Sequence, residues 1–271
     1  MKIPLAVSLE SRNGLPFSDS YVMNGYVQQE PGALKVAKRP GQLSFHQFLA
    51  GVGQGMFEIA GVPYAIIGDT VCLCQSPWTT YAIPTITTAG LFYDVEAQPS
   101  YIATPYAVLK TTAGMWTFNG AVVSKVINAN YPATTVPGLA YCDGAYYVKT
   151  PTGQIYGSAI SDATTWTALN FLTVSDLPGK SVALGKHLNY VLSFAEASVT
   201  FYYDANNPVP GSPLGYAQNL TQGIGCAVAG SISRVGDSVL FMSQTKRGRS
   251  VSIIEGQSLV PVKVSDRKSV V

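Results

Sequence analysis

Apolar residues recur along the chain in short runs, and turn-forming residues separate each run from the next. Many runs alternate with polar positions and are rich in Val, Ile, Tyr, Phe and Thr, a pattern typical of β-strands. The strands predicted in this way are 56–59, 64–67, 106–109, 115–118, 138–141, 145–149, 189–194, 199–203, 238–242 and 250–254. No window of about eleven residues has the spacing of an amphipathic helix. The sequence therefore predicts an all-β protein.

Turns that contain glycine join many of these strands into hairpins. They are Ala60-Gly61, Asn119-Gly120, Asp143-Gly144 and Gly236-Asp237. The hairpins group into units that begin near Gly53, Tyr101, Gly138, Ser181 and Gly230, with a period of 37 to 49 residues. This period is typical of a propeller blade of four short antiparallel strands. We predict about five such units in a β-propeller-like domain over residues 46–271, preceded by an extended docking segment over residues 1–45.

One short motif stands out within the third unit. The six residues from Ser161 to Trp166 resemble the Asp-box of sialidase-like propellers, although Asp162 lies one residue nearer the Trp and Ala163 stands where Gly is usual. The favoured interpretation is structural. Asp162 is expected to accept backbone N–H groups in a turn formed with Ser161 and Thr165, while Trp166 packs between blades.

The composition excludes two classes of protein. Apolar residues make up 47% of the chain and aromatic residues 11%, so a large core is expected and a disordered chain is not. No apolar run is long enough to span a membrane, and Pro4, Ser8 and Glu10 interrupt the N-terminal run too early for an export signal. Synthesis in the cytosol is expected.

The few charges are distributed unevenly. Charged residues make up only 12% of the chain and the net charge is +2, but residues 232–271 hold seven basic and three acidic side chains. Lys246, Arg247 and Arg249 lie together in a Gly-containing turn between two predicted strands. Such a cluster suits sequence-independent contacts with phosphates. A solvated turn and a salt-bridging loop at a subunit interface remain the alternatives.

No constellation of residues indicates catalysis or metal binding. Metalloprotease, nucleophile-elbow and P-loop patterns are absent, and residues 51–55, although Gly-rich, are predicted to lead into a strand. The two histidines, His46 and His187, are expected in turns or at the surface. Asp94 and Glu96 alternate on a predicted strand, so they are expected to share a solvated face. The arginine triad of sialidases is also absent. We predict a protein that is not an enzyme and has no cofactor.

The cysteines and tyrosines suggest two further features. Four cysteines, Cys72, Cys74, Cys142 and Cys226, are too few and too irregularly spaced for a disulfide framework or zinc site, so buried thiols are expected. Sixteen tyrosines together with few charges suit surfaces that become buried on assembly. This combination favours a subunit of a larger structure.

Several motifs, taken in order, resemble the tail nozzle or packaged-DNA stabilisation proteins of short-tailed bacteriophages. They are 1–5 (MKIPL), 24–26 (NGY), 38–41 (KRPG), 53–57 (GQGMF), 64–69 (YAIIGD), 164–171 (TTWTALNF), 225–227 (GCA) and 237–241 (DSVLF). The resemblance extends over nearly the whole chain. It implies a structural virion subunit, made in the bacterial host, that forms a ring of six copies below the portal and its adaptor. Such a ring closes the channel on packaged DNA and conducts the DNA during ejection.

The resemblance also implies partners. These are further copies of the chain, the portal-adaptor proteins, tail needle, spike or fibre proteins, and double-stranded DNA bound without sequence preference. Lys246, Arg247 and Arg249 become candidates for the channel wall or an adaptor contact. Proteins of this family are usually longer, so either few blades complete the propeller or the chain is the N-terminal portion of a longer one. A carbohydrate-binding or glycan-cleaving propeller in a receptor-binding tail component is the alternative function, and a DNA-binding module is a third.

Overall fold

The computed structural model describes residues 25–30, 33–38, 52–84, 94–112, 114–174, 179–208, 210–246, 248–255 and 258–263. The chain divides into two compact units, Met1–Gln47 and Phe48–Val271. In the first unit, β1 (Gly25–Glu30) and β2 (Ala33–Lys38) pair as an antiparallel hairpin. The segment predicted as extended therefore contains a β-hairpin. As for the histidine expected in a turn or at the surface, His46 lies outside the described part of the chain.

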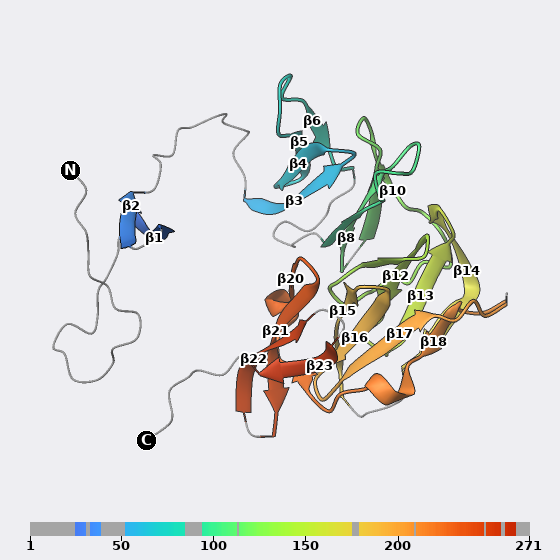
Figure 1. Cartoon of the computed structure of the whole chain (residues 1–271). Helices are drawn as coiled ribbons and strands as arrows, with labels where there is room; N and C mark the ends of the chain where they lie inside the picture. Colours follow the sequence, from blue (N-terminus) through green and yellow to red (C-terminus); the bar gives the residue numbers. More distant parts are fainter. Residues whose placement is uncertain are drawn as a thin grey trace. The chain divides into compact units, whose positions relative to one another are not determined.

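The second unit consists of five antiparallel sheets, the blades of a β-propeller (Figure 1). Blade 1 contains β3 (Gly53–Ile59), β4 (Val62–Ile67), β5 (Thr70–Leu73) and β6 (Thr80–Ala82). Blade 2 contains β7 (Asp94–Ala97), β8 (Ala107–Thr111), β9 (Gly114–Phe118) and β10 (Val123–Lys125). Blade 3 contains β11 (Ala140–Cys142), β12 (Ala145–Lys149), β13 (Gln154–Ala159) and β14 (Asp162–Thr173). Strand order within each of these sheets follows chain order.

Blades 4 and 5 complete the series. Blade 4 contains β15 (Ser181–His187), β16 (Tyr190–Ala195), β17 (Val199–Asp204) and β18 (Leu214–Tyr216). Blade 5 contains β19 (Gly225–Cys226), β20 (Ser233–Val235), β21 (Ser238–Thr245), β22 (Gly248–Glu255) and β23 (Ser258–Lys263). Both β19 and β20 pair with β21, and a short 3-10 helix, Ala229–Ser231, lies between them. The prediction of an all-β propeller with about five units is confirmed.

Two-residue turns set the register of the hairpins. Ala60 and Gly61 have φ angles of 50° and 82°, and Asp143 and Gly144 have φ angles of 46° and 88°. Both turns join directly paired strand ends, Ile59 with Val62 and Cys142 with Ala145. Two successive positive φ angles match the right-handed twist of the flanking strands, which is why such turns favour Asp-Gly. The sequence identified both turns correctly.

Hydrophobic clusters join consecutive blades. The central strand β8 shows how, because Leu109 faces the cluster shared with blade 1 whereas Val108 faces the cluster shared with blade 3. Further clusters join blade 3 to blade 4 and blade 4 to blade 5. Among the described residues, no cluster joins blade 5 to blade 1. A strand packed on both faces has no polar side, so β8 and β12 are buried at every position.

Part of the tyrosine content belongs to the core of the propeller. Five tyrosines are buried within the propeller itself: Tyr64, Tyr141, Tyr146, Tyr147 and Tyr202. They pack between blades, where a long aromatic side chain fills the space between two sheets. These five of the sixteen tyrosines therefore need no second subunit to cover them, whereas Tyr101 and Tyr203 are 85% and 43% exposed.

Two other predictions differ from the structure. His187, expected in a turn or at the surface, is 1% exposed at the end of β15. The sequence predicts residues 51–55 as a loop that leads into a strand. The strand β3 begins at Gly53, so residues 53–55 belong to the strand itself. The cysteines are free thiols as predicted, with Cys72, Cys142 and Cys226 buried and Cys74 partly exposed. No helix in the described ranges is long and apolar enough to cross a membrane.

Candidate functional site

A charged cavity lies among the first strands of the blades. It has a volume of 460 Å³, and its lining includes Met56 in β3, the backbone around Gly138 before β11, and residues of β7, β15 and β20. Four of its lining residues are charged: Asp94, Glu96, Lys186 and Arg234. As predicted, Asp94 and Glu96 share one face of β7. That face borders the cavity, where the Asp94 and Glu96 side chains are 32% and 22% exposed.

Glu96 and Arg234 connect blade 2 with blade 5 across this cavity. The Glu96 Oε1 atom lies 3.4 Å from Arg234 Nη1, and the two side chains are 22% and 53% exposed. Burial raises the pKa of the Glu96 carboxyl, while the charges of Arg234 and Lys186 act in the opposite direction. The pair therefore joins two blades that are far apart in sequence.

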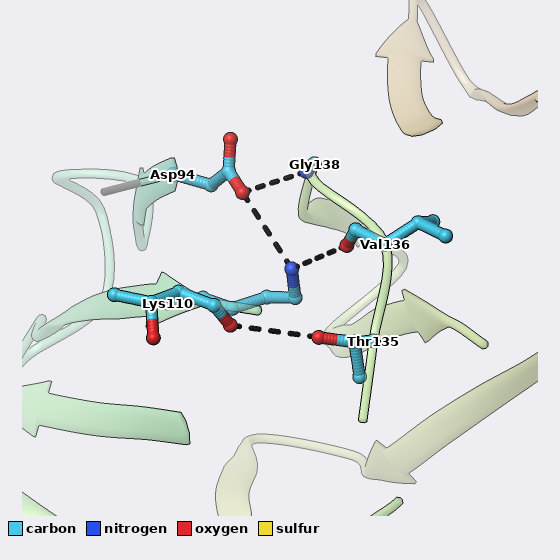
Figure 2. A network of polar contacts seen from close by, with 6 residues as sticks. Asp94, Lys110, Thr135, Val136 and Gly138 are labelled. Carbon is cyan, nitrogen blue, oxygen red and sulfur yellow. Dashed lines mark hydrogen bonds and ion pairs between the residues drawn. The ribbon is translucent and has the colours of Figure 1, made fainter. Parts of the chain in front are cut away.

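Asp94 belongs to a second polar network, shown in Figure 2. Its Oδ2 atom accepts the backbone N–H of Gly138 at 2.6 Å and lies 3.5 Å from the ammonium of Lys110. Lys110 is fully buried and donates to the carbonyl of Val136 at 2.7 Å. Burial lowers the pKa of Lys110, and the neighbouring Asp94 opposes this effect. The network fixes the chain that leads into blade 3 against blade 2.

Gly138 occupies a position that no other residue fits well. Its φ angle is 99°, in the region that L side chains rarely adopt, and a Cβ atom there would collide with the backbone of Leu184. The Leu184 N–H in turn donates to the Pro137 carbonyl at 2.9 Å. The backbones of blades 3 and 4 thus meet at this glycine.

The residues of the Asp-box-like turn lie close together. Asp162 Oδ1 accepts the N–H of Thr164 at 2.8 Å, and Oδ2 accepts the hydroxyl of Thr165 at 2.7 Å. Hydrogen bonds from these two threonines lower the pKa of Asp162. Ser161 has a φ angle of 60° and donates its N–H to the Gly144 carbonyl. Both carboxylate oxygens of Asp162 are thus engaged within the turn.

Trp166 closes the interface next to this turn. The indole is 2% exposed, donates to the Ala163 carbonyl at 2.8 Å, and belongs to the same cluster as Val108 and Met115 of blade 2. The Ala163 N–H donates to the Tyr106 hydroxyl, also in blade 2, at 2.9 Å. The turn and its tryptophan therefore attach blade 3 to blade 2.

The basic cluster lies at the tip of the β21–β22 hairpin. Lys246 and Arg249 are exposed, next to the end pair Thr245 and Gly248. Within the described residues neither cation pairs with a carboxylate. Arg247 lies outside the described residues. The structure thus presents two unpaired cations to solvent at one hairpin.

None of these arrangements is a catalytic or metal-binding constellation. Within the ranges that the structure describes, no group of three or more His, Cys, Asp or Glu side chains is placed to hold a metal ion. The buried charges instead connect blades. The sequence showed the alternation of Asp94 and Glu96, but it gave no signal for their partners Lys110 and Arg234.

Comparison with known proteins decides the family. The family model described as "Bacteriophage P22 Gp10, beta-propeller" matches residues 10–268. The chain belongs to the P22 Gp10 family. This match confirms the resemblance seen in the ordered motifs. As a member of this family of packaged-DNA stabilisation proteins, the chain is a structural component of the phage virion with a tail or head-closure role.

Solved structures give a more general result. The Pan2 WD40 domain of Neurospora crassa aligns with a TM-score of 0.51 and 7% identity, over 79% of this chain and 65% of that one. PorZ of Porphyromonas gingivalis aligns at 0.48 and 12% identity over 79% and 28%, and BBS1N, crystallised with ARL6DN, at 0.46 and 15% identity over 81% and 66%. The chain thus spans less than two thirds of each of these chains. At such identities the Pan2 match supports the fold alone. No curated protein matches the chain significantly.

Proposed function

We propose that the chain assembles with copies of itself into a ring of six below the portal-adaptor complex, where it closes the channel on packaged DNA and conducts the DNA during ejection. The observation that carries this proposal is the family match over residues 10–268. The ring also contacts needle, spike or fibre proteins of the tail. The protein is not an enzyme in this role.

The size of the charged cavity bears on the DNA path that we propose. With a volume of 460 Å³, and with Glu96 paired to Arg234 within it, this cavity is too small to hold even one turn of a DNA duplex. DNA therefore passes through a lumen between subunits rather than through the axis of one propeller. This requirement favours a ring of several copies.

The exposed cations suit contact with this DNA. Lys246 and Arg249 are solvent-exposed and pair with no carboxylate of the described residues, and phosphate contacts of this kind do not depend on base sequence. We place them, together with Arg247, on the channel wall or at the adaptor. The glycan-directed alternative gains no support from the Asp-box-like turn, because Asp162 is already engaged by Thr164 and Thr165.

The ring is tested by electron microscopy. The purified chain is added to portal-adaptor complexes, and a sixfold ring is expected below the adaptor. Failure to add density there would contradict the proposal, as would a ring on the opposite face of the portal. The glycan alternative is tested on a glycan array and in reducing-sugar assays with the same preparation, where saturable binding or sugar release would favour it.

A further inference from the structure

A large groove is lined by residues of both blade 3 and blade 4. It has a volume of 890 Å³ and is lined by β13, β14, the β11–β12 turn and the connection between β17 and β18. In Figure 1, β14, which contributes to the lining, is drawn in yellow. Its lining is mostly apolar and includes Ile160, Leu169 and three prolines, Pro208, Pro210 and Pro213. We call it the interblade groove.

The walls of the interblade groove have an irregular backbone. Ser158 pairs with Trp166 and Tyr156 pairs with Phe171, so one intervening residue on β13 faces four on β14. Those four residues, 167–170, all line the groove. Bulges of this kind redirect side chains and are common next to binding sites. They leave Leu169 58% exposed, and Ile160 nearby is 74% exposed.

Asp143, Asp204 and Asn170 place polar groups on the groove. Asp143 Oδ2 accepts the Cys142 thiol at 3.3 Å, and Asp204 Oδ1 accepts the N–H of Asn206 at 2.7 Å. The side-chain oxygen Oδ1 of Asn170 is buried and has no hydrogen-bond partner, although its Nδ2 donates to the Ser158 carbonyl at 3.2 Å. Asp143 and Asp204 also line the groove, and neither forms an ion pair within the described residues. The two carboxylates give an otherwise apolar groove a negative charge, which suits an occupant that carries a cation.

We propose that the interblade groove binds an extended apolar segment of a partner protein that carries a lysine or arginine side chain. The apolar walls take the aliphatic side chains of the segment. The carboxylates of Asp143 and Asp204 take its cation. Three prolines in the opposite wall hold that wall in shape before the segment binds.

The same chemistry disfavours two other occupants. Nucleic acid would bring phosphates against two carboxylates, which is repulsive. An oligosaccharide usually stacks a sugar face on an exposed aromatic ring. The one aromatic residue on this groove, Tyr147, is 1% exposed and belongs to the core between blades 3 and 4.

The test measures binding of labelled peptides to the whole chain by fluorescence anisotropy. The probe is an apolar heptapeptide with one central arginine, and matched peptides carry glutamine or glutamate in its place. We expect saturable binding of the arginine peptide and at least about tenfold weaker binding of the glutamate peptide. Maltoheptaose serves as the saccharide probe, and no binding of it is expected.

Variants locate the binding on this groove. Asp143→Asn combined with Asp204→Asn is expected to weaken binding of the arginine peptide about tenfold. The three peptides should then bind with equal affinity. Asparagine tolerates the positive φ angle at position 143, so the turn is retained. Leu169→Glu changes the apolar wall of the groove and leaves both carboxylates in place. It should also weaken binding of the arginine peptide.

A matched control and three outcomes decide the matter. Asp237→Asn changes a carboxylate in a turn of blade 5 that does not line the groove, so binding should be unchanged. Absence of saturable binding by any peptide would overturn the proposal. Equal affinity for the arginine and glutamate peptides would overturn it as well. So would binding of maltoheptaose in place of the peptides.

Discussion

Lys149 is expected to make the propeller more stable as the pH rises from about 8 to 10.5. This lysine in β12 is 1% exposed, and its ammonium donates to the Phe194 carbonyl in β16 at 3.0 Å. It has no carboxylate partner in the described part of the chain. Burial alone lowers its pKa from 10.5 to about 8. Replacing it by methionine removes the charge and keeps most of the volume.

The magnitude and the sign follow from linkage. At about 1.4 kcal/mol for each unit of pKa, the difference between 10.5 and about 8 makes the charged form roughly 3 kcal/mol less favourable in the folded chain. Below pH 8 this cost is fully present, because Lys149 is protonated in both states. Between pH 8 and 10.5 the folded state binds fewer protons, so stability rises with pH.

Urea unfolding from pH 7 to pH 10 measures the effect. The free energy of unfolding of Lys149→Met minus that of the unchanged chain should fall by roughly 2 kcal/mol over this range. The lost hydrogen bond to Phe194 shifts the difference by a constant that does not alter its slope. Lys125→Met, at an exposed position of β10, is the control and should show no slope. A flat difference for Lys149→Met would refute the reasoning.

Three further substitutions test individual parts of the structure. Gly138→Ala should destabilise the chain by about 3 kcal/mol or more in urea unfolding, because it adds a Cβ at a φ of 99° against the Leu184 backbone, whereas Gly230→Ala, with open space around it, should cost under about 1 kcal/mol. Asp162→Ala should cost about 1–2 kcal/mol in the same assay through loss of its turn hydrogen bonds, and a cost near zero would contradict the assigned role. Replacing Lys246 and Arg249 by Ser should reduce the slope of log affinity for duplex DNA against log salt by nearly 2, and an unchanged slope would exclude these residues as phosphate contacts.

The sequence predicted the blades because blade structure is local. Each hairpin is specified by neighbouring residues, such as Asp143 and Gly144 with their positive φ angles. The period of the units then follows from successive hairpins. What holds one blade to the next is not local. The partners of Asp94 are 16 and 44 residues away, and Arg234 is 138 residues from Glu96. No spacing rule pairs them.

The same limit explains the errors on single residues. His187 is a polar residue at a strand end, next to the Leu188-Asn189 turn, and its surroundings would normally place it at the surface. It is buried because blades lie on both sides of blade 4. The five tyrosines buried between blades show a related limit, because the pattern indicates that a side chain is to be covered but not by which part of the protein.

The low charge content follows from the same architecture. A strand packed between two blades has no solvent face, so β8 and β12 each carry a single charged residue, Lys110 and Lys149, and the propeller buries both. Each of these lysines donates across to the next blade, to Val136 and to Phe194. Among the charges that the propeller does not bury are the cations of the basic hairpin and the two carboxylates beside the interblade groove. The charges thus divide into a set that joins blades and a set available to partners, and it is the second set that the binding experiments address.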